Sequence, residues 1–193
     1  MPVAAFFHTV DQSILLWLQD AIRCPALSAL LVPLTIVGEG GIIWILISAV
    51  MLFFPRTRKI GWMALVAMLL CYLLNDKLFK VLVERPRPFF AMANLQTLIP
   101  IPLSWSFPSG HACSSFAAAT IYSHGGEKRW LKAVFWALAV TMAFSRMYVG
   151  VHYPTDVLAG ALVGVVGSSL IWRMLQRRYD LIEAHITEHR RTA

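Results

Sequence analysis

The sequence predicts an all-α fold, namely a polytopic membrane bundle of about six transmembrane helices preceded by an N-terminal interfacial helix. Of the 193 residues, 58% are hydrophobic and only 14% are charged, whereas soluble domains have about 45–50% and 25%. The mean hydropathy of +0.64 points the same way. Apolar runs also alternate with short charged or Gly/Pro-rich stretches. Residues 1–193 are therefore expected to form a single membrane-embedded domain.

The N-terminal segment, residues 1–23, is expected to lie at the membrane surface as an amphipathic helix. It carries Asp11, Asp20 and Arg23 among apolar residues. Charged side chains at these positions would be costly inside lipid, but they suit a helix that lies in the interface. The segment has no basic start and no small-residue cleavage site, so no cleavable signal peptide is expected.

Six apolar windows follow, and each is expected to form a helix. Several of them are shorter than the roughly 20 residues that a membrane span needs. Polar ends or a locally thin bilayer would have to complete the short ones, so five or seven spans remain as alternatives. The windows are residues 25–38, 41–54, 60–82, 110–123, 130–147 and 156–175.

Basic residues set the expected orientation, because short loops rich in Lys and Arg stay in the cytoplasm. Residues 55–59, 125–132 and 173–178 are basic, whereas the turn at 38–40 carries no positive charge. Six spans in an inner (plasma) membrane would put these basic segments and both termini in the cytoplasm, with residues 177–193 as a tail. The net charge of +7 thus lies at membrane boundaries, and nucleic-acid binding is not expected.

Three polar segments fall on the opposite, extracytoplasmic side in this topology. Ionisable groups at membrane depth are costly and usually line a site or a water-filled cavity. Three cations beside two imidazoles and a carboxylate would suit a polyanion. Lysines and arginines near helix ends often only extend toward lipid headgroups, but that alternative does not explain why histidines and an aspartate gather on the same side. The segments are NDKLFKVLVERPRPFF (75–90), WSFPSGHACSS (105–115) and SRMYVGVHYPTD (145–156).

The second segment has the composition of a helix start that binds an anion. Pro108 suits the first turn of a helix, and Ser106 could cap it. Ser109, Gly110 and His111 would then carry N–H groups without partners inside the helix, and such groups bind phosphate or sulfate. A simple Pro-Ser-Gly turn with a structural histidine is the alternative.

The third segment places His152 and Asp156 four residues apart. If Pro154 opens a helix, Asp156 lies in its first turn, where the helix dipole favours a carboxylate. From there it could accept a hydrogen bond from the imidazole and make the other ring nitrogen a better nucleophile. Asp156 could instead be a helix cap, and the two roles can coexist.

The three segments together resemble the signature of the type 2 phosphatidic acid phosphatase superfamily. That superfamily includes lipid phosphate phosphatases, undecaprenyl diphosphate phosphatases, glucose-6-phosphatase and vanadium haloperoxidases. The six-residue spacing selects Lys80 over Lys77, and it leaves Arg85 as an auxiliary cation or a headgroup contact. The catalytic motifs span residues 80–156 and read Lys80-x(6)-Arg87-Pro88, Pro108-Ser109-Gly110-His111 and Ser145-Arg146-x(5)-His152-x(3)-Asp156.

The resemblance implies a role for each residue. His152 would attack phosphorus and form a phosphohistidine, oriented by Asp156, while His111 would protonate the leaving oxygen and later activate water. Arginine suits the binding of phosphate because its planar fork donates two parallel hydrogen bonds. The oxygens of the phosphate would be bound by Lys80, Arg87, Ser109, Gly110 and Arg146.

Neither a metal nor a cofactor is expected. The carboxylates near the segments, Asp76, Glu84 and Asp156, do not form the clustered oxygen site that Mg²⁺ prefers. The three cysteines are widely spaced and flanked by apolar residues, so no disulfide framework or metal site follows from them.

The predicted function is that of an integral membrane phosphatase that hydrolyses the terminal phosphate of a lipid phosphate or diphosphate. Its partners would be that substrate and membrane lipids; the oligomeric state is not predicted. Undecaprenyl diphosphate is favoured because the short chain resembles compact bacterial enzymes of that type. Phosphatidylglycerophosphate and phosphatidic acid are alternatives, as are a lipid phosphotransferase, a vanadate-dependent halide oxidation and a non-enzymatic phosphate transporter or scaffold.

Two further apolar features are interpreted as packing. The glycines Gly160, Gly164 and Gly167 would let the last helix approach the core closely. Between the first two polar segments, Phe89 and Phe90 could gate an alkyl chain, as could Met92 and Leu95 beside them, although interfacial packing explains them equally well.

Overall fold

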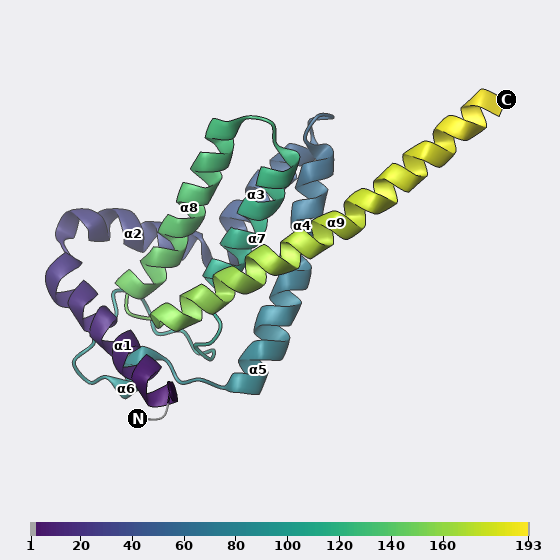
Figure 1. Cartoon of the computed structure of the whole chain (residues 1–193). Helices are drawn as coiled ribbons and strands as arrows, with labels where there is room; N and C mark the ends of the chain where they lie inside the picture. The colour runs from purple at the N-terminus through teal and green to yellow at the C-terminus, as the bar shows by residue number, and fades with distance from the viewer. Residues whose placement is uncertain (1–2, 193) are drawn as a thin grey trace.

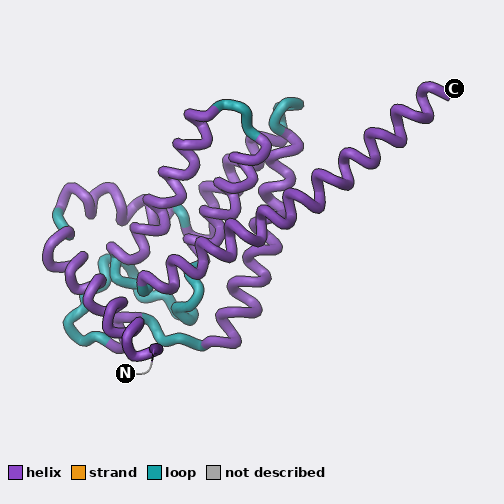
Figure 2. The backbone as a smooth tube through the Cα atoms, viewed as in Figure 1, coloured by secondary structure: helices purple, strands orange, loops and turns teal. Residues whose placement is uncertain are grey.

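The computed structural model describes residues 3–192, with side chains for residues 8–179 and 181. This part of the chain is helical and contains no strand (Figure 2), which confirms the all-α prediction. The elements in order are α1 (Val3–Trp17), the π-helix η1 (Leu18–Ile22), α2 (Pro25–Val37), the 3₁₀-helix η2 (Glu39–Gly41), α3 (Ile42–Leu52), α4 (Arg58–Tyr72), the π-helix η3 (Leu73–Phe79), α5 (Lys80–Val83), α6 (Pro88–Ala91), α7 (Gly110–Gly125), α8 (Arg129–Tyr148) and α9 (Pro154–Thr192).

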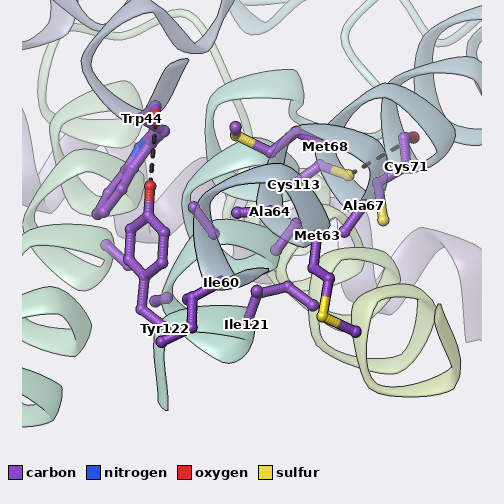
Figure 3. Close-up of a cluster of buried hydrophobic side chains, with 14 residues drawn as sticks. Trp44, Ile60, Met63, Ala64, Ala67, Met68, Cys71, Cys113, Ile121 and Tyr122 are labelled. Atoms are coloured by element: carbon purple, nitrogen blue, oxygen red, sulfur yellow. Dashed lines mark hydrogen bonds between the residues drawn. The ribbon is translucent and has the colours of Figure 1, made fainter. Parts of the chain in front are cut away.

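Helix α7 forms the centre of the bundle, between α4, α8 and α9 (Figure 1). Its sequence allows this because Ala117, Ala118 and Ala119 are fully buried and leave room for close neighbours. Larger side chains from α3 and α4 fill the space around it, and Trp44 is the bulkiest of those that are fully buried. Figure 3 shows the hydroxyl of Tyr122 directed at the backbone oxygen of Trp44, 3.1 Å away.

Glycines let α9 approach α7 closely, as the sequence predicts. A Cβ atom at Gly160 would lie 2.3 Å from the backbone oxygen of Ser109, and one at Gly164 would lie 2.4 Å from the backbone oxygen of Cys113. Such distances are too short for a side chain. The start of α9 is thereby held against the segment that precedes α7.

The six apolar windows all form helices, but the structure does not establish six membrane spans. Within the described residues, α9 is long and apolar enough to cross a membrane over Pro154–Tyr179, with a mean hydropathy of 1.7. Helices α2 and α3 meet this criterion only as a pair bent by 57° at Gly38. The six-span topology requires the turn at 38–40 to be an external loop between two spans. In the structure the chain bends there by 57°, and Glu39 and Gly40 line a cavity.

The N-terminal helix packs against the loops at one end of the bundle. Asp11 of α1 is only 1% exposed and accepts a hydrogen bond from the backbone N–H of Thr155, at the start of α9. Arg23, which follows η1, donates to the backbone oxygens of Tyr148 and Gln96. These polar groups face the protein rather than lipid headgroups, because they tie the N-terminal segment to the loops at one end of the bundle.

The described ends of the chain lie at opposite ends of the bundle, and the expected position of both termini in the cytoplasm stays a prediction. Helix α1 lies beside α6 at the end of the bundle where α9 begins, whereas α9 carries the C-terminus away from that end (Figure 1). The physical reason is the bend between α2 and α3, where the chain turns by 57° instead of reversing. The tail predicted over residues 177–193 continues α9 as helix to Thr192; the side chains of residues 182–193 lie outside the described part.

Candidate active site

A cavity of about 550 Å³ lies where the three polar segments meet. Six of the eight predicted site residues line it, and Ser109 and Asp156 are buried next to lining residues. The structure therefore brings the three segments to one place, at the end of the bundle where α9 begins. The six lining residues are Lys80 and Arg87, Gly110 and His111, and Arg146 and His152.

The imidazole of His152 lies between an aspartate and an arginine. Its Nδ1 is 3.5 Å from Oδ2 of Asp156, longer than an ordinary hydrogen bond, and its Nε2 is 3.3 Å from Nη1 of Arg87. Because a guanidinium can only donate, this contact favours a neutral ring with a lone pair on Nε2. Burial lowers the pKa of His152 to about 3, although Asp156 opposes the shift. The ring that faces the cavity is therefore neutral at physiological pH.

Four groups hold the carboxylate of Asp156. One oxygen accepts hydrogen bonds from the hydroxyl of Ser106, at 2.5 Å, and from the backbone N–H of Tyr153, at 2.9 Å, and it also faces His152. The other oxygen accepts from Arg85 at 2.7 Å. Helix α9 does begin at Pro154, as the sequence predicts. Asp156 is thus both the cap of its helix and the neighbour of the imidazole.

Arg87 is fixed in the cavity wall by carbonyl groups. Its Nε and Nη2 donate to the backbone oxygen and the hydroxyl of Ser104, and its Nη1 donates to the backbone oxygen of Val151 at 2.8 Å. Burial lowers the pKa of Arg87 to about 10, which leaves it charged at neutral pH. The guanidinium is therefore positioned before any anion binds.

The segment before α7 leaves polar atoms unpaired beside the cavity. Among the described side chains, five buried polar atoms have no hydrogen-bond partner, and three of them belong to predicted site residues, namely Oγ of Ser109, Nε of Arg146 and Nδ1 of His152. Helix α7 begins at Gly110 with Ser109 as its N-cap residue, so the N–H groups of its first turn also lack partners within the helix. Buried donors of this kind indicate an anion site. The expected role of Ser106 as a cap of α7 is wrong, because its hydroxyl donates to Asp156.

Thr35 at the end of α2 contacts two site residues. Its backbone oxygen lies 3.1 Å from Nε2 of His111, and its hydroxyl accepts a hydrogen bond of 2.5 Å from Nη1 of Arg146. The carbonyl is available because carbonyls in the last turn of a helix have no intrahelical partner. If Nε2 donates to this carbonyl, Nδ1 of His111 is the nitrogen left to exchange protons.

Lys80 opens α5, directly after a π-helical stretch. The π-helix η3 ends immediately before it, and single π-turns of this kind often occur at functional sites. Lys80 forms an ion pair with Asp76, four residues earlier. Lys77 is exposed and does not line the cavity; its ammonium lies 5.8 Å from the centre of the Tyr72 ring. The motif spacing therefore identifies the lysine that lines the cavity.

One wall of the cavity is apolar, but not the wall expected from the sequence. The lining residues on this side come from α3 and α4 and are Ile45, Leu65, Met68, Leu69 and Tyr72. Met92 and Leu95 pack instead against Leu15 of α1, and Phe89 packs in a cluster with Tyr148. The proposed alkyl gate before the second segment is therefore not part of the cavity.

Sequence reasoning missed the residues that support the site from other elements, chiefly Asp11, Thr35 and Ser106. A charged residue in an apolar helix, such as Asp11, is a signal in itself, although it does not name its partner. Thr35 and Ser106 give no comparable signal. No group of three or more His, Cys, Asp or Glu side chains in the described part of the chain is arranged to hold a metal ion.

Comparison with known proteins gives matches to phosphatases. An undecaprenyl-diphosphatase of Sulfolobus acidocaldarius is 37% identical over 123 residues, which is 63% of this chain and 58% of that protein. This chain thus spans less than two thirds of that relative.

Two solved structures resemble the fold. The structure of Aquifex aeolicus LpxE has a TM-score of 0.74 at 28% identity and covers 83% of this chain and 93% of its own. That of a transmembrane PAP2-type phosphatidylglycerolphosphate phosphatase from Bacillus subtilis has a TM-score of 0.70 at 27% identity and covers 88% of this chain and 86% of its own.

A family model covers most of the helical core and the whole of the cavity's three motifs. It matches residues 60–180, more than half of the chain, and its description is the PAP2 superfamily. All three polar segments fall within this match. The chain therefore belongs to the PAP2 superfamily, as its three motifs predict.

Proposed function

We propose that this chain is an integral membrane phosphatase that removes the terminal phosphate from a lipid phosphate or diphosphate through a phosphohistidine. One observation carries the proposal: the neutral, buried imidazole of His152 faces a cavity that Lys80, Arg87 and Arg146 also line. The unpaired Nε of Arg146 and Oγ of Ser109 lie in its wall and next to it. A phosphate fits this combination because the donors can bind its oxygens while the imidazole faces phosphorus. Membership of the PAP2 superfamily supports the same reaction class.

In the first step, Nε2 of His152 attacks phosphorus and the bond from phosphorus to the leaving oxygen breaks. Asp156 stabilises the positive charge that develops on the ring, because it faces Nδ1. A protonated His111 gives its proton to the leaving oxygen. The negative charge of a bound phosphate favours that protonated form of His111, which otherwise lies near two cations. The product is a neutral lipid alcohol or a lipid monophosphate.

In the second step, water attacks the phosphohistidine. His111 accepts a proton from the water, the bond between phosphorus and Nε2 breaks, and inorganic phosphate leaves. The non-bridging oxygens would be bound in both steps by Lys80, Arg87, Ser109, the N–H of Gly110 and Arg146. Fixed donors of this kind stabilise the charge on the equatorial oxygens without reorganising.

Undecaprenyl diphosphate is the substrate that we propose first, because the relative from Sulfolobus acidocaldarius carries the name undecaprenyl-diphosphatase. The apolar cavity wall from α3 and α4 can accept a hydrocarbon chain beside the phosphate. Phosphatidylglycerophosphate is the second candidate, because the solved phosphatase that acts on it aligns over 88% of this chain.

The charges of the loops support a proposal for the orientation of the protein in the membrane. Residues 55–59 and 125–132 are basic and lie at the end of the bundle opposite to the cavity (Figure 1). By the preference of such loops for the cytoplasm, we propose that the cavity opens on the extracytoplasmic face of the plasma membrane and that the C-terminal end of α9 is cytoplasmic. Helix α1 would then lie on the extracytoplasmic side.

The test is release of inorganic phosphate from a panel of lipid phosphates in detergent, with EDTA present. The expected result is hydrolysis without added metal, fastest for undecaprenyl diphosphate, and loss of activity by several orders of magnitude in His152→Ala. Full activity of His152→Ala would overturn the phosphohistidine. Transfer of labelled phosphate to another lipid, with none released, would make the protein a phosphotransferase. Saturable phosphate binding without turnover would make it a transporter or scaffold.

A further inference from the structure

Arg85 lies behind the catalytic aspartate rather than in the cavity. Its Nη1 donates to Oδ1 of Asp156 at 2.7 Å and to the hydroxyl of Thr155 at 2.7 Å. Its guanidinium carbon lies 3.9 Å from the centre of the Tyr153 ring. The side chain is 19% exposed and does not line the cavity. Arg85 therefore contacts the carboxylate that faces His152 but not the place where phosphate would bind.

Asp11 of α1 holds the other end of this guanidinium. One of its oxygens accepts from Nη2 of Arg85 at 2.7 Å and from the hydroxyl of Thr155, and the other accepts from the backbone N–H of Thr155. The side chain of Asp11 is 1% exposed. A buried carboxylate is costly unless it is paired, and here its partners are Arg85 and the first turn of α9.

The guanidinium thus bridges a carboxylate of α1 and a carboxylate of α9. Burial alone would lower the pKa of Arg85, but the carboxylates of Asp11 and Asp156 outweigh it and raise the pKa. The bridge is therefore charged at physiological pH. Arg85 donates to Oδ1 of Asp156. Oδ2 is therefore the oxygen that faces His152, Ser106 and the backbone of Tyr153.

We infer that Arg85 and Asp11 are positioning residues for the pair of His152 and Asp156, and that α1 is required for catalysis through this bridge. The inference rests on the proposed role of His152. By fixing one carboxylate oxygen, Arg85 prevents Asp156 from rotating. Asp156 then faces Nδ1 and, together with Arg87 at Nε2, favours the tautomer of His152 that carries its proton on Nδ1 and a lone pair on Nε2. Asp11 keeps the guanidinium in the orientation in which Nη1 reaches Oδ1 of Asp156.

The kinetic test compares Arg85→Gln, Arg85→Lys and Asp11→Asn with the wild type on one lipid phosphate. Arg85→Gln is expected to lower kcat by roughly 10- to 100-fold, as for other residues that orient a reacting group. KM and inhibition by inorganic phosphate should stay unchanged, because Arg85 does not line the cavity. Arg85→Lys keeps the charge but cannot bridge both carboxylates, so its loss should be intermediate.

Two measurements separate this role from plain structural support. The double variant D11N/R85Q should be no slower than R85Q, because both residues act through the same carboxylate. Ethylguanidinium added to Arg85→Ala should restore part of kcat. Arg23→Gln is the matched control: Arg23 also ties the N-terminal segment to the loops, but it contacts backbone oxygens and not Asp156. This variant is expected to lose thermal stability. Its kcat and the tautomer of His152 should stay as in the wild type.

A readout without turnover keeps the inference separate from the proposed function. Nitrogen-15 NMR of histidine-labelled protein reports which ring nitrogen of His152 carries the proton. The wild type and Arg23→Gln should show the Nδ1–H form, and Arg85→Gln should show a mixture of both forms.

An unchanged tautomer and unchanged kcat in Arg85→Gln would overturn the inference. A change confined to KM and phosphate affinity would also overturn it, because Arg85 would then bind phosphate. If the wild type released no phosphate, the proposed function would fail, and the NMR comparison would still decide this point.

Discussion

His152 has its reactivity set by neighbours from three segments of the chain. Arg87 contacts Nε2 and Asp156 faces Nδ1, while Arg146 adds a second positive charge nearby. Burial disfavours the protonated form of this imidazole most, and the two cations add to the effect. The cationic groups that would bind phosphate therefore also help to keep the proposed nucleophile unprotonated.

This arrangement predicts how stability depends on pH. Burial lowers the pKa of His152 from its ordinary value of 6.5 to about 3 in the folded protein. The unfolded chain therefore binds a proton as the pH falls below about 6.5, while the folded protein does not. The contribution to stability is fully present above pH 6.5 and is lost progressively as the pH falls toward 3, by up to about 1.4 kcal/mol per pH unit.

Thermal unfolding in detergent between pH 7 and pH 4 tests this prediction in the wild type and in His152→Gln. The wild type should lose stability more steeply as the pH falls, because the glutamine of the variant does not titrate. Titrating groups far from residue 152 contribute equally to both proteins, so the difference between the two curves reports His152 together with Asp156, whose pKa His152 helps to lower. Parallel curves over the whole range would mean that His152 has an ordinary pKa in the folded protein.

The motif residues could be predicted from the sequence, whereas the residues that hold them in place could not. Spacing alone selects Lys80 and Arg87, because the alternative lysine would pair with a glutamate, and Pro154 marks the helix that places Asp156 in its first turn. Asp11 is recognisable as a charge in an apolar segment. Its partner Thr155 is 144 residues away, and no periodicity connects two such positions.

At the scale of elements, α9 is held against the segment before α7 by the contact at Gly160. A Cβ atom there would lie 2.3 Å from the backbone oxygen of Ser109 and 3.2 Å from its backbone nitrogen. Backbone atoms cannot move aside as the end of a side chain can, so the helices would have to separate. Ser109 is part of the proposed phosphate site, and the packing of α9 therefore sets the geometry of that site.

Gly160→Ala is accordingly expected to destabilise the protein by about 1–3 kcal/mol and to lower phosphate release. Gly164→Ala should destabilise it similarly, with less effect on activity, because it meets the backbone oxygen of Cys113 further along α7. Gly167→Ala is the matched control. It meets only the sulfur of Cys71 at 2.9 Å, and alanine gains about 1 kcal/mol of helix propensity over glycine.

Thermal unfolding and phosphate release of the three variants should therefore rank Gly167→Ala nearest to the wild type. If all three variants were as stable as the wild type, the close approach of α9 to α7 would not contribute to the fold. If Gly160→Ala lost stability but kept full activity, Ser109 would be insensitive to the position of α9.

The helices themselves follow from the apolar windows, but the path of the chain between them does not. Hydropathy gives the length of a helix and not its direction relative to the next one. A reversal and a bend at residues 38–40 have the same composition, and the glycines Gly40 and Gly41 allow either. They adopt positive φ angles of 62° and 75°, which permits the 57° bend between α2 and α3. Glu39 and Gly40 then line the cavity instead of an outer surface.

The molecule as a whole is polarised along its long axis. The cavity, α1 and the loops that carry the motifs lie at one end, whereas the basic loops before α4 and before α8 lie at the other (Figure 1). Figure 2 shows the longer loops gathered at the cavity end and short connections at the opposite end. In a membrane this polarity would separate a face that meets the substrate headgroup from a face that meets the cytoplasm.

This polarity predicts which residues a membrane-impermeant maleimide can reach in intact cells. In a variant without native cysteines, Asp20→Cys and Leu103→Cys should be labelled from outside, because Asp20 follows α1 and Leu103 lies in the loop between α6 and α7, both at the cavity end. Arg56→Cys lies in the basic loop between α3 and α4 and should be labelled only after the membrane is opened. All three side chains are exposed, so access to solvent does not distinguish them, and phosphate release by each variant verifies the fold.

Labelling of Asp20→Cys together with Arg56→Cys and not with Leu103→Cys would return α1 to the cytoplasmic side. It would contradict the contact of Asp11 with Arg85, because one helix cannot reach both faces of the bundle.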